Sequence, residues 1–287
     1  MPLRRTPTLR QRRLGIELRK MRERAGFGGS QLARTLGLNP TQVTQMESGK
    51  IGVSAERLRT VAAACSCANE PLISALADMT AERSKGWWEA YRGALSTDFL
   101  DVAEMEGHAQ GLATCTSTYI PGLLQTSAYA SAVFSRVYPP LPAHDLDIRT
   151  TFRMRRQQVV RSDGIPYRVF IHEAALRMQF GGPRVLADQL GSLIEDSQTP
   201  GLSVRVVSFD TDTFPGSSEN LTYAEGPVPE LDTVQMDIPN GSQYFDSQAH
   251  LESYRAIFAR MDLSALPEEE SRDLMRRIKK EKEDKLG

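Results

Sequence analysis

Four side chains that can read the edges of DNA bases stand close together in the sequence: Thr41, Gln42, Thr44 and Gln45. Hydroxyl and amide groups on short or medium side chains donate to, and accept from, base edges in the major groove. A short helix that turned these groups towards solvent would suit the recognition of double-stranded DNA. We therefore predict that these four residues contact bases.

The residues around this group predict a helix-turn-helix. Asn39 is a good N-cap, Pro40 fits the first helical position, and Gln42 stands where the second member of a capping box belongs. Gly37 supplies a turn residue that reaches positive φ at little steric cost. A preceding short helix and this one would share an apolar side, made of Leu32, Ala33, Leu36, Val43 and Met46.

A second set of residues is expected to contact phosphate groups. The start of a helix exposes free amide groups that attract anions, and hydroxyl, amide or ammonium side chains beside it add donors. The residues placed in this set are Gly29, Ser30, Asn39, Ser48 and Lys50.

The charge of the chain is divided unevenly along its length. Residues 1–60 hold 13 Lys and Arg against 4 Asp and Glu, whereas the remainder holds 22 against 32. A positive N-terminal region suits the phosphate backbone, while an acidic remainder would be repelled by it. The acidic region is therefore expected to bind a protein or a small ligand.

Patterns for catalysis, metal binding and membrane insertion are not found in the sequence. His172-Glu173 begins like a zinc-protease motif, but Leu176 stands where the second histidine would be needed. Cys65, Cys67 and Cys115 are an odd number and show no metal-ligand spacing, so we expect buried thiols in a reducing compartment. We expect a cytoplasmic protein that is not an enzyme, has no cofactor, metal or membrane contact, and joins the nucleoid when bound to DNA.

Length and patterning predict an α+β protein of two domains. We expect a basic arm over 1–11, an all-α five-helix domain over 12–79, a hinge over 80–86, a mixed α/β domain with a small sheet over 87–265, and a charged helix over 266–287. The helix-turn-helix lies in the all-α domain. In the second domain, helices are expected over 100–110, 145–161, 173–179, 183–196, 248–261 and 268–285, and strands over 113–120, 167–171, 203–209, 221–223 and 233–237.

Residues 12–68 resemble the Xre-type, or phage-repressor-like, helix-turn-helix. The resemblance is carried by Leu32-Ala33, Gly37, Val43 and Met46-Glu47-x-Gly49. The sequence departs from the family at Gly29, where such proteins often have a glutamine that contacts phosphate. The resemblance implies sequence-specific DNA binding.

The region from Trp88 onwards resembles the C-terminal domain of the WhiJ-like regulators, an actinobacterial family described as antitoxin-like. The residues that carry this resemblance are Glu104-x-Glu106, Ile120-Pro-Gly-Leu-Leu-Gln-Thr126, Tyr129-Ala130, Arg153-x-x-Arg156-Gln157, Glu173-Ala-Ala-Leu176, Gly181-Gly-Pro183, Gln189-Leu190 and Ser271. It implies a protein that binds promoters through its N-terminal domain and a small protein, often encoded nearby, through its C-terminal domain.

Arg149, Arg153 and Arg156, together with Trp87 and Trp88, are the expected contacts for a partner or ligand. The arginines could instead form an ion-paired surface, and the tryptophans could pack in the interior. The preferred hypothesis is a homodimeric transcriptional regulator controlled by a small partner protein. The alternative is a regulator that senses a small molecule in a pocket of the second domain.

Overall fold

The computed structural model describes residues 6–81, 86–215, 220–238 and 241–285. The chain divides into two compact units, Met1–Ala90 and Tyr91–Gly287. The expected arm over 1–11 includes residues 1–5, and the expected hinge over 80–86 includes residues 82–85. Both of these segments lie outside the described residues.

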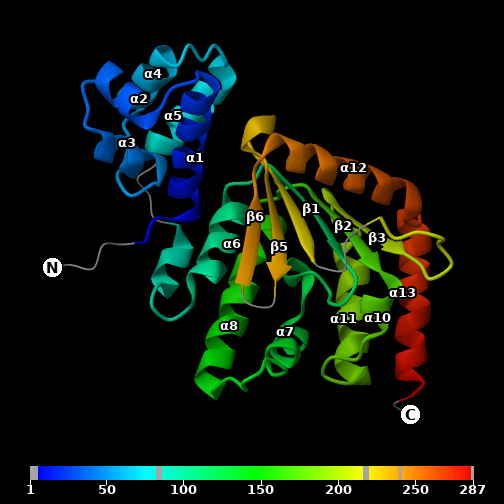
Figure 1. Ribbon diagram of the computed structural model, residues 1–287. Coiled ribbons are helices and arrows are strands. Elements are labelled where there is room, and N and C mark those ends of the chain that lie inside the picture. Colours follow the sequence, from blue (N-terminus) through cyan, green and yellow to red (C-terminus); the bar gives the residue numbers. More distant parts are fainter. Residues whose placement is uncertain (1–5, 82–85, 216–219, 239–240, 286–287) are drawn as a thin grey trace. The chain divides into compact units, whose positions relative to one another are not determined.

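The first unit is helical (Figure 1). Its helices are α1 (Leu9–Arg24), α2 (Gly29–Thr35), α3 (Pro40–Glu47), α4 (Ala55–Ala64) and α5 (Glu70–Ala81), and a 3-10 helix, η1 (Trp87–Tyr91), follows. Helix α1 begins three residues before the predicted start at Arg12. Thr8 caps it, because the Thr8 hydroxyl accepts from the Gln11 amide while the Gln11 side chain accepts from the Thr8 amide.

Helices α1 and α3 pack so closely that a side chain would not fit between them. A β-carbon added at Gly15 would lie 2.4 Å from the carbonyl oxygen of Glu47, and one added at Gly49 would lie 2.7 Å from that of Gln11. Gly49 also has a φ of +68° and ends the α3 segment. The backbone contact therefore fixes where α3 lies on α1.

The second unit is built on a mixed sheet of six strands in the order β3-β2-β1-β4-β5-β6. Strands β1, β2 and β3 run parallel, and β4 pairs antiparallel with β1, β5 with β4, and β6 with β5. The strands are β1 (Gly111–Thr116), β2 (Tyr167–His172), β3 (Leu202–Val207), β4 (Leu221–Glu225), β5 (Thr233–Ile238) and β6 (Gly241–Phe245). The expected α+β class is confirmed.

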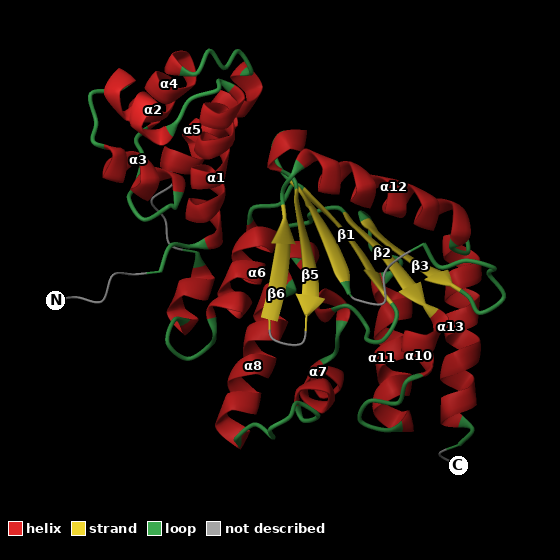
Figure 2. Ribbon diagram, in the orientation of Figure 1, coloured by secondary structure: helices red, strands yellow, loops and turns green. Residues whose placement is uncertain are grey.

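Helices cover both faces of this sheet, as Figure 2 shows: α12 crosses one face, and α8, α10 and α11 lie on the other. The helices of the unit are α6 (Thr97–Gly107), α7 (Ser127–Phe134), α8 (Ala143–Arg156), α9 (Gln158–Arg161), α10 (Glu173–Arg177), α11 (Pro183–Asp196), α12 (Gln248–Ser264) and α13 (Glu268–Glu283), with short 3-10 turns η2 (Gly122–Leu124) and η3 (Pro229–Leu231).

Three features of the second unit differ from the sequence prediction. The strand expected over 113–120 ends at Thr116 in β1. The helix expected over 145–161 is divided at Gln157 into α8 and α9. Strand β6 was not expected, because Gly241–Phe245 is a short polar segment at the edge of the sheet without an apolar pattern. Only its pairing with β5 identifies it as a strand.

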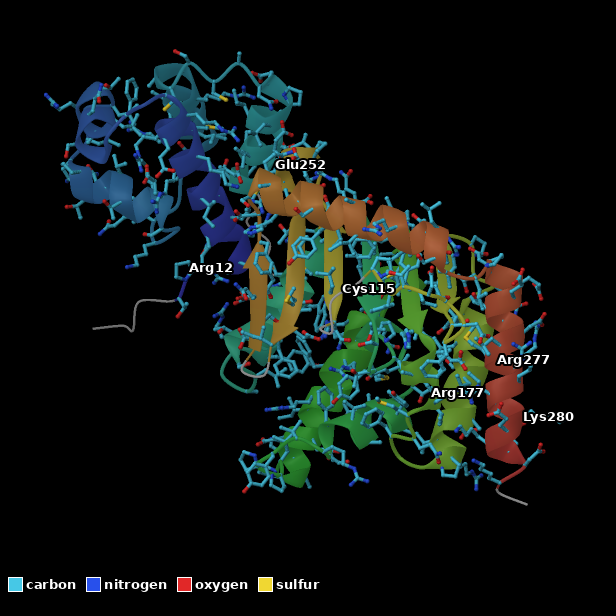
Figure 3. All side chains as sticks on the ribbon, turned by 45° about the vertical axis from the view of Figure 1, so that its right-hand side comes forward. Arg12, Cys115, Arg177, Glu252, Arg277 and Lys280 are labelled. Atoms are coloured by element: carbon cyan, nitrogen blue, oxygen red, sulfur yellow. The ribbon has the colours of Figure 1, made fainter. Side chains whose placement is uncertain are left out.

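The core between the sheet and α12 is apolar. Cys115, labelled in Figure 3, is buried in it beside Phe170, Leu251 and Phe258. Burial raises the pKa of the Cys115 thiol to about 12, so the thiol stays protonated at neutral pH.

Helix α13 packs against α11 and β3 through one apolar side. Leu274, Met275 and Ile278 are buried on that side. Arg277 and Lys280 are exposed, and Figure 3 shows them on the outer side of the helix. Buried apolar residues recur here at helical spacing with charged residues between them. This spacing explains why the segment could be predicted as a helix.

The contact between α1 and α3 gives a first prediction. Gly15→Ala is expected to lower the free energy of unfolding of the first unit by about 1–3 kcal/mol, since the new methyl group would clash with rigid backbone. Tryptophan fluorescence during urea denaturation would measure this, because both tryptophans, Trp87 and Trp88, belong to that unit. Gly29→Ala is the control: nothing lies within 4 Å of its added β-carbon, so stability should barely change. An equal effect of both changes would contradict the prediction.

Candidate functional site

The outer side of α3 presents most of the residues predicted to contact bases. Thr41, Gln42 and Thr44 are exposed, and Gln45 is half-buried. Val43 and Met46 are buried on the opposite side of the helix, and Leu32 of α2 is buried as well. The apolar residues therefore fix which way the polar residues point.

Hydrogen bonds within α3 decide what its polar groups can still offer to a partner. The Gln42 side-chain oxygen accepts from the Asn39 amide at 3.1 Å, and Asn39 Oδ1 accepts from the Gln42 amide at 2.9 Å. The amide group of the Gln42 side chain is thus left as a donor. The Thr44 hydroxyl donates to the Pro40 carbonyl at 3.1 Å, so its lone pairs are left as acceptors.

The residues predicted to contact phosphate lie at the start of α2 and at both ends of α3. Gly28 is the N-cap of α2 and offers no side-chain cap, so the amides of Gly29 and Ser30 lie at an uncapped helix start. Lys50 is exposed just beyond the end of α3. The Ser48 hydroxyl is held by the Gln45 carbonyl at 3.2 Å, and the Asn39 side chain is used in the cap.

An ion pair connects α3 to α1 and to the turn before α2. Arg22 Nε donates to Glu47 Oε1 at 2.6 Å and Nη2 donates to Oε2 at 2.9 Å, while Nη1 donates to the Phe27 carbonyl at 2.8 Å. This bidentate pair raises the pKa of Arg22. Arg22 thereby holds three segments of the unit in one geometry.

Gly37 has a φ of +65°, so the turn predicted between α2 and α3 is confirmed.

The arginines of α8 do not share one environment. Arg156 forms a bidentate pair with Glu106 of α6, with Nε donating to Oε2 at 2.8 Å and Nη2 to Oε1 at 2.5 Å. Burial alone would lower the pKa of Arg156, but the adjacent Glu106 carboxylate outweighs it and raises the pKa. Arg149 lies over the ring of Phe99, 5.2 Å from its centre. Arg153 lies 4.1 Å from the centre of the Phe134 ring.

Three buried glutamines hold the segment 120–126, which contains the Pro-Gly-Leu-Leu-Gln-Thr run. Gln125 Nε2 donates to the Ile120 carbonyl, Gln157 Nε2 donates to the Gln125 carbonyl, and Gln189 Nε2 donates to the Leu124 carbonyl, each at 2.7 Å. In the sequence these glutamines only formed part of the resemblance to the WhiJ-like regulators, and no structural role was predicted for them. A signal was available, since Gln189 interrupts the apolar side of 183–196 between Leu186 and Leu193.

The two tryptophans predicted as partner contacts belong to the first unit. Their rings meet edge to face, with centres 5.9 Å apart. Trp88 is buried and Trp87 is half-buried. The two rings therefore pack against each other, and their contact with a partner stays a prediction.

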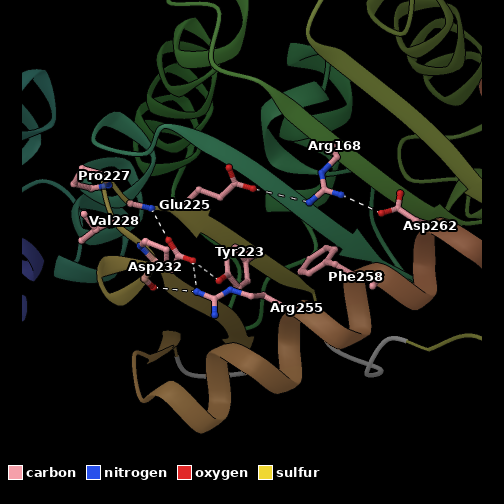
Figure 4. Close-up of a pocket in the computed structure, with 12 residues that line it drawn as sticks. Arg168, Tyr223, Glu225, Pro227, Val228, Asp232, Arg255, Phe258 and Asp262 are labelled. Atoms are coloured by element: carbon pink, nitrogen blue, oxygen red, sulfur yellow. Dashed lines mark hydrogen bonds and ion pairs between the residues drawn. The ribbon is translucent and has the colours of Figure 1, made fainter. Parts of the chain in front are cut away.

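A hollow of about 580 Å³ lies in the second unit between α12 and the segment that follows β4, as Figure 4 shows. Its charged side chains are paired with one another: Arg168 with Asp262 at 3.1 Å and Arg255 with Asp232 at 2.6 Å. Asp232 also accepts from Tyr223 and from the Gly226 amide. The hollow is therefore lined by charges that are already paired, together with apolar side chains such as Val228 and Phe258.

The described part of the chain holds neither a cluster of metal ligands nor a membrane-spanning helix. No group of three or more His, Cys, Asp or Glu side chains is placed there to hold a metal ion. None of the described helices combines the length and the apolar character needed to cross a membrane.

Comparison with known families agrees with the geometry of the first unit. Residues 13–76 match the family model described as a helix-turn-helix domain, so this region is a DNA-binding module of the kind found in transcriptional regulators. Residues 99–277 match the model described as a domain of unknown function, DUF5753. The chain belongs to this DUF5753 family. No curated protein and no solved structure shows a significant match.

The pair formed by Arg156 and Glu106 gives a second prediction. Arg156→Met is expected to lower the free energy of unfolding of the second unit by about 3–5 kcal/mol, because it leaves the Glu106 carboxylate buried without a counter-charge. Circular dichroism during urea denaturation would measure the change. The double variant Glu106→Leu with Arg156→Met should recover most of the loss, since it removes both charges. A single variant as stable as the natural protein would contradict this account.

Proposed function

We propose that the protein is a transcriptional regulator that binds promoter DNA as a homodimer, with α3 in the major groove. The observation that carries the proposal is the exposed polar side of α3, which is held to α1 by Gly15 and by the Arg22–Glu47 pair. Thr41, Gln42, Thr44 and Gln45 would read bases. Gly29, Ser30, Asn39, Ser48 and Lys50 would contact phosphate groups.

A dimer is part of the proposal because one short helix reads only a few base pairs. Two copies bound to half-sites one turn of DNA apart would multiply the preference for the specific site over other DNA sequences. The proposal implies a cytoplasmic protein that joins the nucleoid with its DNA, and it includes no catalytic step. Membership of the WhiJ-like regulators of actinobacteria remains part of the proposal, and the Pro-Gly-Leu-Leu-Gln-Thr run supports it.

The test of α3 uses a duplex obtained by selection from random sequences with the full chain. Gln45→Ala and Thr41→Ala are each expected to weaken binding to this duplex by about 1–3 kcal/mol, with little change on unrelated DNA. Lys50→Ala should weaken binding to every sequence and reduce the dependence on salt concentration by about one counter-ion. Fluorescence anisotropy over a range of salt concentrations would measure both.

Thr60→Ala is the matched control for this test. Thr60 is an exposed threonine of α4, so it matches Thr41 in residue type and exposure but lies outside the residues proposed to contact DNA. Its loss should leave DNA binding unchanged. Natural affinity in all of the α3 variants would show that another surface reads the DNA. A selected sequence without two related half-sites would argue against the homodimer.

We also propose that the second unit binds a small protein that changes DNA binding. The support is its excess of acidic residues, which suits a partner and not DNA, together with the resemblance described above. Co-expression with the small protein encoded next to the gene should give a stable complex on size-exclusion chromatography. The absence of a complex at micromolar protein concentration would count against this partner.

A small-molecule effector is the second candidate, and one observation favours it. Arg153 is a largely buried guanidinium that faces no carboxylate within ion-pair distance in the described parts of the second unit. A ligand could supply that charge.

A further inference from the structure

Arg153 and Arg156 stand one turn apart on α8, yet only one of them has a counter-charge. Arg156 uses its Nε and Nη2 groups on the two oxygens of Glu106. Among the described residues, no carboxylate lies within 4.0 Å of Arg153, and its Nε is buried without a hydrogen-bond partner. A buried cation without a counter-charge is costly, so this arrangement calls for an explanation.

The guanidinium of Arg153 is held in a fixed orientation. The ring of Phe134 lies 4.1 Å away on one side, and the α-carbon of Gly122 faces it as well, since a β-carbon added there would lie 3.5 Å from Arg153 Nε. Nη1 donates to Gln125 Oε1 at 2.7 Å. Nη2 makes no hydrogen bond to any residue that the structure describes. A preorganised donor of this kind binds an anion without first losing side-chain freedom.

The charges around Arg153 leave an excess of positive charge. Arg156 and Arg149 of the same helix act to lower the pKa of Arg153, whereas Asp237 and Glu106 act to raise it. Glu106 is already used by Arg156, and Asp237 is exposed and accepts from Gln235 at 2.7 Å. Burial, with a further contribution from Arg156, lowers the pKa of Arg153 to about 9, so it remains a cation at neutral pH.

We propose that Arg153 is the anion-binding residue of an effector site in the second unit, and that its ligand is a small molecule with a carboxylate or phosphate group. The partial burial of Arg153 beside Phe134 and Gly122 favours a small oxyanion over a protein surface as its ligand. Bound charge at Arg153 would act on Gln125, whose side chain also holds the Ile120 carbonyl and so the segment 120–126. Its role as an effector site rests on the proposed regulatory function, but anion binding itself does not.

The test measures thermal unfolding and calorimetric binding of the full chain in sodium phosphate, sodium succinate and sodium chloride at equal ionic strength. Phosphate stabilises many proteins without binding at one site, so the informative quantity is the difference between variants in the same salt. The natural protein is expected to gain stability in at least one oxyanion relative to chloride. Arg153→Gln should lose this gain, with affinity lower by about 10- to 100-fold.

Arg161→Gln is the matched control, because it removes one arginine charge from the neighbouring helix α9, where Arg161 pairs with Asp196 at 2.9 Å. It should keep the full response to the oxyanion. If Arg153→Gln does not fold, Arg153→Lys serves instead: it keeps the charge but lacks the planar fork, so it should bind the same oxyanion more weakly than the natural protein. A response to phosphate alone or to succinate alone identifies the anionic group.

Equal responses in the natural protein and in Arg153→Gln, or no response in the natural protein, would overturn the proposal. So would loss of the complex with a small protein partner in Arg153→Gln without any effect of small oxyanions, which would assign Arg153 to that interface. DNA affinity is measured separately in the same salts. Oxyanion binding without DNA binding would refute the regulator and keep the site, whereas DNA binding without oxyanion binding would do the reverse.

Discussion

The backbone contact between α1 and α3 is the constraint on which the first unit depends. Gly15 lets the two helices approach until its α-carbon meets the Glu47 carbonyl, and Gly49 does the same against Gln11. The pair between Arg22 and Glu47 then joins the end of α3 to α1. A helix as short as α3 has little stability of its own, so its orientation comes from these contacts and from its buried apolar side. The polar side chains on the outer side thereby stay exposed.

The second unit uses buried polar groups for a comparable purpose. The segment 120–126 is irregular, and its carbonyl groups would be costly to bury without donors. Gln125, Gln157 and Gln189 supply those donors from within the segment, from the junction of α8 and α9, and from α11. The segment is therefore fixed by amide side chains from different elements.

The edge of the sheet at β3 shows how the end of the chain completes the fold. The Ser271 hydroxyl accepts from the Val206 amide at 2.9 Å, and the Leu266 amide donates to the Val206 carbonyl at 2.9 Å. Arg205 donates to the Ala265 carbonyl at the end of α12. The link between α12 and α13 thus occupies edge groups that could otherwise pair with another strand.

The sequence by itself determined the local features of this protein: the cap at Asn39, the turn at Gly37, the polar side of α3 and most of the helices and strands. These features depend on residues that are neighbours in the sequence and on the spacing of apolar residues. Both can be read from the sequence alone. The tertiary structure alone decided that Gly241–Phe245 is a strand, because only pairing with β5 defines it. It also decided that Arg156 has a carboxylate partner and Arg153 has none among the described residues, although the two arginines look alike in the sequence. The reason is that their difference depends on a carboxylate, that of Glu106, which stands 50 residues from Arg156 along the chain and only the fold brings to its side.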